Sequence, residues 1–195
     1  AVLKPDKYLI FTRRGINIDE YPAIKEHLKV FKTSLMPGGE GGRKAGSYQW
    51  YEIQDTVAYF AEFEKPKIII PSIVKSASYA FDTEGFYGND KTTIIPLDDK
   101  YLLALLNSTT IDYFLKTIAA TKQGGFFEYK PVYISQLPIK EISEETKEPF
   151  KKLVAEILAK KQNGEETGEL EHRIDEMVYR LYELTEAEIA VVEKS

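Results

Sequence analysis

The stretch that decides the fold begins with KPKIIIP at residues 65–71 and continues with FYGND at residues 86–90. It then reads YLLALLNS at residues 101–108 and ends with YISQLPI at residues 133–139. Three consecutive isoleucines have the composition of a buried strand, whereas the leucine-rich run has the spacing of a helix. Short strands and helices follow one another here without regular βαβ alternation, and this pattern predicts an α+β domain built on small mixed sheets.

Further elements are expected on both sides of this stretch. Residues 7–12 are apolar and β-prone and predict a strand, and Asp19 is placed to cap a helix from about Tyr21 to Phe31. Residues 48–53 form either a short strand or the approach to a helix near 56–62. The glycine-rich residues 37–46 predict a loop. A helix is expected at 111–118, after a break at Asn107 and Ser108. Further strands are expected at 68–70, 73–81, 92–95, 126–129 and 132–134.

The end of the chain has a different pattern. Residues 148–161 and 168–184 place apolar side chains at helical spacing, and Asn163 and Gly164 separate the two runs. Residues 185–188 read Thr-Glu-Ala-Glu, a capping box that begins a short last helix. Two amphipathic helices joined by a short polar loop predict an antiparallel hairpin. We therefore expect a front domain of residues 1–140 and a C-terminal helical hairpin of residues 141–195.

The charge is distributed unevenly between these two parts. Residues 1–140 hold 18 Lys and Arg against 16 Asp and Glu, a net charge of +2. Residues 141–195 hold 8 against 15, a net charge of −7. The overall charge of −5 therefore belongs to the tail, and the front domain is mildly basic.

Composition excludes several classes of protein. The chain has no cysteine, so disulfides and cysteine-ligated metals are excluded. It has no run of eighteen apolar residues and no signal-peptide pattern, so we expect no membrane span and a cytoplasmic location. It begins with Ala1 rather than Met, which is the pattern expected of a piece of a larger protein.

Motifs for metal or nucleotide chemistry are weak. His27 and His172 lie on separate expected helices and fit no ligand spacing. The glycine loop fails the pattern of a P-loop, because Arg43 stands where the second glycine is needed and Ala45 where Ser or Thr belongs. Asp98-Asp99-Lys100 contains the Asp-x-Lys element of metal-dependent nucleases, although such residues before a helix are more often a cap.

The order and spacing of the four pieces between residues 65 and 139 resemble the TaqI-like C-terminal specificity domain. That domain is the target-recognition module of adenine-N6 DNA methyltransferases and of type IIG restriction-modification enzymes. Three further segments share the resemblance. Residues 10–31 look like the segment that precedes this domain in these enzymes, and Arg43-Lys44 followed by Trp50-Tyr51 is similar to the family's pair of basic residues followed by a tryptophan. Residues 174–185 are similar to the helical ending of many such methylases.

The resemblance implies sequence-specific recognition of double-stranded DNA. It also implies a parent methyltransferase whose N-terminal catalytic domain is missing from this chain. That domain is expected to use S-adenosylmethionine as its cofactor. If the parent also cleaves DNA, Mg²⁺ is a second expected cofactor. The Asn/Asp-Pro-Pro-Tyr element that holds the flipped base in this class has only Lys130-Pro131-Val132-Tyr133 as a counterpart, and lysine supplies no acceptor. We therefore expect no methyl transfer by this chain alone and no cofactor in it.

Candidate DNA contacts follow from the chemistry of recognition, since phosphates need Lys or Arg and base edges need Arg, Lys, Gln, Asn, Ser or Thr. Three segments supply both kinds of residue: Arg43, Lys44, Tyr48 and Gln49 in the first, Lys75, Ser76 and Ser78 in the second, and Lys122, Gln123 and Lys130 in the third. Arg43 and Lys122 are expected to be exposed. The lone Trp50 is expected in the core, with Tyr48 left at the surface.

Two rival functions stay open. The first is a protein–protein interaction module that acts through the acidic helical hairpin, with the front domain as its support. The second is an independent metal-dependent nuclease that uses Asp98 and Asp99. Salt separates the first rival from DNA recognition, because binding to several phosphates weakens steeply as salt rises and an apolar helix interface does not.

Overall fold

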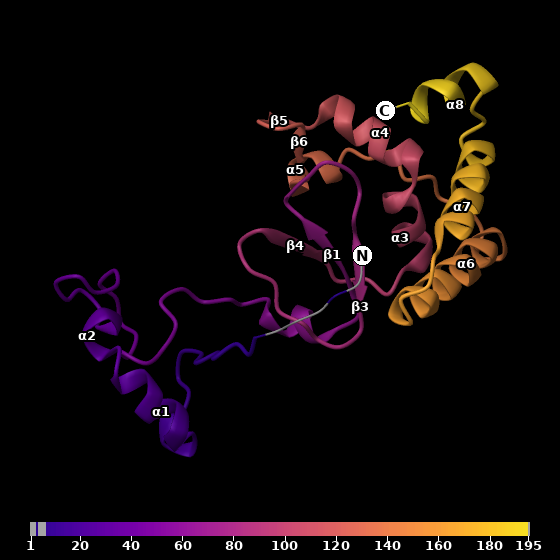
Figure 1. Cartoon of the computed structure of the whole chain (residues 1–195). Helices are drawn as coiled ribbons and strands as arrows, with labels where there is room; N and C mark the ends of the chain where they lie inside the picture. Colours follow the sequence, from indigo (N-terminus) through magenta and orange to yellow (C-terminus); the bar gives the residue numbers. More distant parts are fainter. Residues whose placement is uncertain (1–2, 4–6, 195) are drawn as a thin grey trace. The chain divides into compact units, whose positions relative to one another are not determined.

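A computed structural model describes residue 3 and residues 7–194 of the chain. These residues form two compact units (Figure 1). The smaller unit is residues 7–60, and the larger unit is residue 3 with residues 61–194. This division differs from the one expected between residues 140 and 141, since the last helices belong to the same compact unit as the central sheets. The α+β class is confirmed, because the larger unit combines small antiparallel sheets with helices.

The smaller unit is mostly irregular chain around three short helical segments. These are the 3₁₀ turn η1 (Ile18–Glu20), α1 (Pro22–Lys29) and α2 (Lys32–Leu35). The expectation of a cap by Asp19 is wrong, because Asp19 lies inside η1 and α1 instead begins with Pro22, whose fixed φ suits a first turn. The expected strand at 7–12 is also wrong, since these residues pair with no strand.

A central three-stranded sheet forms one layer of the larger unit. It consists of β1 (Lys67–Pro71), β3 (Ala80–Asp82) and β4 (Thr92–Ile95), in the order β3-β1-β4 with both pairs antiparallel. Ile69 lies opposite Ala80 on one side and Ile94 on the other. The three isoleucines of β1 are buried, as their composition predicted.

A second three-stranded sheet follows from a change of direction after Pro71. It contains β2 (Ile73–Val74), β5 (Thr121–Lys122) and β6 (Phe126–Glu128), in the order β2-β6-β5. The single strand expected at 73–81 is therefore wrong, because β2 and β3 belong to different sheets. Between β2 and β3, the side chains of Asp112 and Asn107 accept hydrogen bonds from the main-chain N–H groups of Ala77 and Tyr79. These N–H groups are therefore not used in a sheet, and the strand is interrupted there.

Two helices separated by one residue pack on these sheets. They are α3 (Lys100–Asn107) and α4 (Thr109–Ile118). Asp99 accepts a hydrogen bond from the Leu102 N–H at 2.9 Å, and Ser108 caps α4 at the expected break. The expected strand at 132–134 is wrong, because Pro131 begins a short helix, α5 (Pro131–Ile134), there. The helix expected near 56–62 is a 3₁₀ turn, η2 (Phe60–Glu64).

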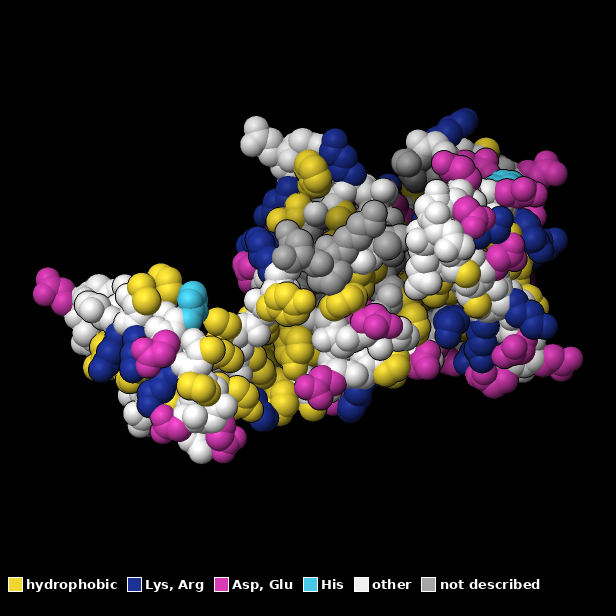
Figure 2. All heavy atoms as spheres, turned by 60° about the horizontal axis from the view of Figure 1, so that its bottom comes forward, with side chains coloured by type: hydrophobic (Ala, Val, Ile, Leu, Met, Phe, Trp, Pro, Cys, Tyr) yellow, Lys and Arg dark blue, Asp and Glu magenta, His cyan; other side chains and the backbone are white. Residues whose placement is uncertain are grey.

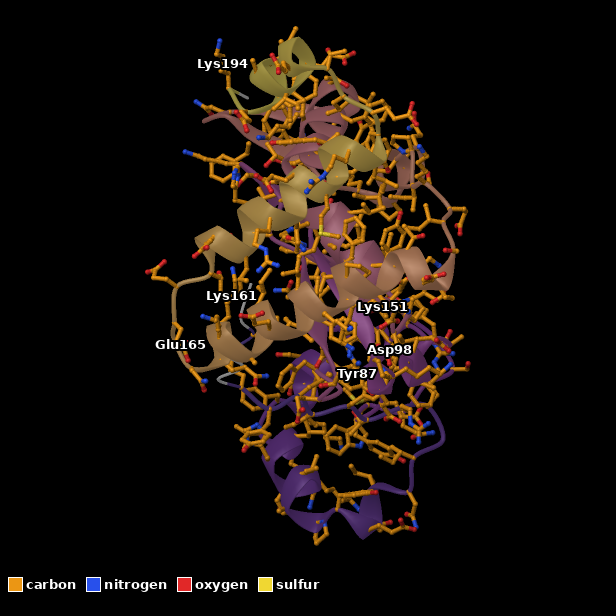
Figure 3. The ribbon with its side chains drawn as sticks, turned by 90° about the vertical axis from the view of Figure 1, so that its right-hand side faces the viewer. Tyr87, Asp98, Lys151, Lys161, Glu165 and Lys194 are labelled. Atoms are coloured by element: carbon orange, nitrogen blue, oxygen red, sulfur yellow. The ribbon has the colours of Figure 1, made fainter. Side chains whose placement is uncertain are left out.

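The C-terminal helices form the expected hairpin and are followed by a third helix. They are α6 (Glu144–Gln162), α7 (Gly168–Leu181) and α8 (Glu186–Val192). Figure 3 shows α6 and α7 side by side, with Lys161 and Glu165 near the turn that joins them. The capping box between Thr185 and Glu188 is confirmed. No helix within residue 3 and residues 7–194 is long and apolar enough to cross a membrane.

The core of the larger unit lies around α3, which Figure 1 shows between the central sheet and the α6–α7 pair. The rings of Tyr101 on α3 and Phe150 on α6 meet edge to face, 5.3 Å apart. The apolar stripes of α6 and α7 belong to this same buried cluster, which includes Leu153, Ile174 and Val178. The hairpin therefore uses its apolar face to complete its own unit.

Candidate nucleic-acid interface

The second sheet places lysines from three segments on one exposed face. In the ladder between β5 and β6, Lys122 lies opposite Phe126. In the ladder between β2 and β6, Val74 lies opposite Phe127, so Lys75, the next residue along the chain, continues opposite Phe126. Residues directly opposite one another share a face of a sheet. The strand order therefore gives a row of Lys75, Phe126 and Lys122.

The aromatic ring in this row is packed under a cation. The Lys75 ammonium lies 5.2 Å from the centroid of the Phe126 ring, a cation–π contact. Lys75 itself stays exposed, while Phe126 is half-buried. The ring therefore supports one lysine stem and keeps its charge at the surface.

Glu128 on β6 and Lys130, two residues further along the chain, extend the row. Alternate residues of an extended chain point to the same side, so Phe126, Glu128 and Lys130 share one face while Tyr129 is fully buried on the other. The Glu128 carboxylate lies 2.9 Å from the Lys122 ammonium and 2.8 Å from that of Lys130. We call this surface, made by Lys75, Lys122, Phe126, Glu128 and Lys130, the lysine face.

The charges of the lysine face stabilise one another. The hydrogen bonds from Lys122 and Lys130 lower the pKa of the Glu128 carboxyl below its ordinary value. The hydrogen bond to Glu128 in turn raises the pKa of Lys122. The two shifts favour the ionised forms of Glu128 and Lys122, and two lysines beside one carboxylate leave a net positive surface.

A tight turn joins β5 to β6 beside the lysine face. Its three residues are Gln123, Gly124 and Gly125, and all three are exposed. Both glycines have positive φ, +83° and +77°, a backbone conformation that side chains disfavour. The two glycines are therefore required by the turn, and they place Gln123 at its tip.

The segment after β2 contributes less than the sequence suggested. Lys75 and Ser76 are exposed next to the second sheet. Ser78 is half-buried and lines a pocket of about 370 Å³ with Asn107 and Asp175, among α3, α6 and α7. Lys75 thus belongs to the lysine face with the exposed Ser76 next to it, whereas Ser78 faces the helical side.

In the smaller unit, Arg43 is a structural residue. Its guanidinium donates to the main-chain carbonyls of Leu35 at 2.9 and 2.7 Å, of Glu52 at 2.6 Å and of Trp50 at 2.8 Å. Four of its five N–H groups are therefore engaged inside the unit. The expectation of an exposed Arg43 is wrong, since the side chain is half-buried and holds the glycine loop against residues 50–52.

The burial of Tyr48 and Trp50 is the reverse of what was expected, since Tyr48 is buried and Trp50 is partly exposed. Tyr48 is 5% exposed and lies beneath the Arg43 guanidinium, 4.8 Å from ring centroid to Cζ. Trp50 is only half-buried, with the Lys32 ammonium 5.3 Å from its ring. Tyr48 therefore supplies the core of this small unit, while Lys44 and Gln49 remain exposed candidates on it.

The comparison with known protein families gives the identity of the domain. The family model of the TaqI-like C-terminal specificity domain matches residues 2–139. This match covers well over half of the chain. The chain belongs to this family.

A methyltransferase relative agrees with this assignment. The type II methyltransferase M.MjaIV of Methanocaldococcus jannaschii is 25% identical over 166 residues, which cover 82% of this chain and 55% of the relative. The chain therefore spans about half the length of that methyltransferase. The match is broad enough to include both the central sheet and the second sheet.

Charge on the larger unit of this specificity domain is unevenly distributed. In Figure 2, Lys and Arg side chains lie on the flank opposite the helical hairpin with few acidic side chains beside them, whereas over the helices Lys and Arg are interspersed with Asp and Glu. This flank coincides with the part of the fold where the second sheet lies in Figure 1. A specificity domain with an acidic overall charge thus still has a basic surface.

The Asp98-Asp99-Lys100 sequence, considered above for nuclease chemistry, lies at the start of α3 in this specificity domain. Asp99 is the N-cap of α3, and Lys100 lies 3.7 Å from Asp98 and 5.1 Å from the Phe81 ring centroid. Within residue 3 and residues 7–194, no three His, Asp or Glu side chains are grouped so that they could hold a metal ion. The three residues therefore start a helix, the more frequent role for this pattern.

Two residues of the lysine face were missed by sequence reasoning. In an extended strand every second residue points to the same side, so Phe126 and Glu128 share a face with Lys130, and this period of two is the signal that could have placed them beside that lysine. The pairing of β6 with both β2 and β5 was not predicted. Without that pairing, Lys75 appears on an expected strand and Lys122 in a glycine loop, with nothing to connect the two.

Proposed function

We propose that this specificity domain recognises a sequence in double-stranded DNA on behalf of a restriction-modification adenine-N6 methyltransferase. The lysine face carries the proposal, because it gathers Lys75, Lys122 and Lys130 on one surface of a chain that belongs to a target-recognition family. Lysines of this kind contact phosphates and fix the register of a protein on the duplex. The catalytic domain, with S-adenosylmethionine as its methyl donor, would lie outside these 195 residues.

The turn between β5 and β6 supplies the base-reading part of the proposal. A two-stranded β-ribbon fits the major groove, and Gln pairs in bidentate fashion with the N6 and N7 edge of adenine. Gln123 lies in the turn of such a ribbon, next to Lys122, which would hold a phosphate. The target adenine would then be flipped out of the duplex toward the catalytic domain.

The protein-interaction rival loses the observation that favoured it. The apolar stripe of the helical hairpin packs into the core of its own unit, through Phe150, Leu153 and Ile174 among others. What the hairpin leaves at the surface is largely charged. DNA recognition is therefore the function that this arrangement supports best.

The test is binding of the chain to a randomised duplex DNA pool at low salt, with sequencing of the retained fraction and a salt titration. Lys122→Ala and Lys130→Ala should each weaken retention and reduce the slope of log affinity against log salt by about one. Lys151→Ala is the matched control, because Lys151 on α6 also pairs with carboxylates but lies on the acidic hairpin (Figure 3).

Each result of this test has a clear meaning. An enriched motif that weakens in the Lys122 and Lys130 variants, but not in the Lys151 variant, would support recognition through the lysine face. Retention that depends on salt but selects no motif would support DNA binding and assign base reading to other parts of the enzyme. Retention that is absent at low salt would overturn the proposed function.

A further inference from the structure

Glu128 is an unusual residue to find at the centre of a surface that is meant to attract phosphate. Its side chain is only 11% exposed, whereas those of Lys122 and Lys130 are 47% and 49% exposed. The carboxylate therefore lies beneath the two ammonium groups. An acidic residue that merely reduced the charge of the patch would not need to be buried between two lysines from different segments.

The backbone explains why Glu128 cannot move away. It lies on the middle strand, β6, where Ile73 of β2 is its partner in the ladder. Its neighbour Tyr129 is fully buried, and the Tyr129 N–H bonds the Ser72 carbonyl at 2.9 Å. The carboxylate is therefore fixed by the central strand, and each lysine that bonds to it takes up a defined position.

The two bonds leave most of the donor capacity of the lysines available. An ammonium group has three N–H donors, and each lysine uses one of them on Glu128. Two donors on each lysine can still bond phosphate oxygens. The carboxylate also offsets the repulsion between two like charges that share one surface.

We propose that Glu128 is a positioning residue that holds Lys122 and Lys130 as a fixed pair of contacts to the DNA backbone. This inference rests on the proposed function. Two freely moving lysines lose side-chain entropy when a phosphate immobilises them, whereas two lysines already held by Glu128 have less to lose. The buried carboxylate thus strengthens phosphate binding although its own charge opposes it.

Glu144 offers a matched control within the same chain. Its carboxylate also bridges two lysines, Lys147 at 2.8 Å and Lys151 at 2.7 Å. It lies at the start of α6, 71% exposed, on the acidic hairpin and outside the lysine face. Glu144→Gln therefore removes the same charge and the same kind of bridge without touching the proposed contacts.

The experiment is a double-mutant cycle on the 195-residue chain, with random-sequence duplex DNA as the probe. Lys122→Ala is measured in three backgrounds: wild type, Glu128→Gln and Glu144→Gln. Positioning predicts that Lys122→Ala weakens binding about tenfold in wild type and in E144Q, but less than about threefold in E128Q. Glu128→Asp, which keeps the charge, should restore part of the Lys122 effect.

Other outcomes would overturn the inference in distinguishable ways. If Lys122→Ala weakens binding more in E128Q than in wild type, Glu128 masks the lysine and does not position it. An equal effect in all three backgrounds would show that Glu128 does not act on binding through Lys122. If the wild-type chain fails to retain duplex DNA, the proposed function falls, and this inference falls with it.

A measurement on the free protein separates loss of the bridge from loss of the fold. The pKa of Lys122 is raised by its hydrogen bond to Glu128, so it should fall in E128Q and stay unchanged in E144Q when followed by NMR titration. Circular dichroism should be the same for all variants. An unchanged Lys122 pKa in a folded E128Q would contradict the bridge itself.

Discussion

The guanidinium of Arg43 donates four hydrogen bonds to the main-chain carbonyls of Leu35, Trp50 and Glu52. Its planar fork can satisfy three carbonyls at once, which an ammonium group on a flexible stem cannot do. In the sequence, Arg43 and Lys44 look alike, as two cations after a run of glycines. The environment separates them: Arg43 holds the loop, and Lys44 extends into solvent.

Arg43→Ala should therefore destabilise the smaller unit, by about 2–4 kcal/mol, because it leaves several carbonyls without their charged donor. Arg43→Lys should recover little of that loss. The fluorescence of Trp50, the one tryptophan of the chain, reports the urea-induced unfolding of this unit. Lys44→Ala is the control and should change the free energy of unfolding by less than about 0.5 kcal/mol. An unchanged midpoint for Arg43→Ala would contradict the structural role.

The turn between β5 and β6 is the element on which the lysine face depends. Gly125 has a φ of +77° and no atom within 4 Å of the position of an added Cβ. Gly125→Ala should therefore destabilise the turn only through backbone strain, by about 1–2 kcal/mol. Faster hydrogen exchange of the β5 and β6 amides and weaker DNA binding are the expected results.

A second glycine provides the control for that strain. Gly41, in the loop of the smaller unit, has a φ of +68° and the same open surroundings. Gly41→Ala should introduce similar strain and leave DNA binding unchanged. Equal loss of binding in both variants would argue against a special role for the β5–β6 turn.

The packing of α7 against the start of α4 depends on one carboxylate. Asp175 accepts hydrogen bonds from the Thr109 N–H and hydroxyl, both at 2.7 Å. Burial raises the pKa of Asp175 above its ordinary value of 3.8 despite these bonds. The folded state therefore holds this proton more tightly than the unfolded state, and the stabilisation is complete below pH 3.8 and lost as pH rises through the folded pKa.

Asp175→Asn removes this titration. The stability of the variant relative to wild type should increase as the pH rises from about 3.5 to 7, because only wild type must ionise a partly buried carboxyl. Urea midpoints of both proteins across this range measure the difference. A difference that stays constant with pH would show that Asp175 is not perturbed.

At the scale of the whole molecule, the helical hairpin and the sheets share one core. Phe150 on α6 is 3% exposed and packs against Tyr101 on α3. Phe150→Ala should lower the free energy of unfolding of the larger unit by about 3–5 kcal/mol. Far-ultraviolet circular dichroism, which reports the helices, should show the lower urea midpoint.

The two compact units should respond separately to this change. The midpoint seen by Trp50 fluorescence, which reports residues 7–60, should stay in place in Phe150→Ala. Arg43→Ala should show the converse pattern. A shift of both signals together in either variant would indicate one cooperative transition for the whole chain.

Local chemistry is what the sequence determined by itself. The buried strand at Ile68–Ile70, the caps Asp99 and Ser108, and the capping box at Thr185 depend on composition or on partners within three residues, and the structure contains each of them. The same run of packing residues carried the resemblance to the specificity-domain family, and the match over residues 2–139 confirms it. Lys75, Lys122 and Lys130 could be selected by residue type alone.

Only the tertiary structure decided which of these residues act together. Asp112 binds the Ala77 N–H from 35 residues away and divides the strand that the sequence predicted. The pairing of β6 with β2 and β5 brings Lys75 to the same face as Lys122, with Glu128 beneath. Such contacts join groups that are distant along the chain, and no local pattern encodes them. For the same reason Arg43 and Tyr48 proved to be internal: their partners are carbonyls and rings that only the folded backbone brings into reach.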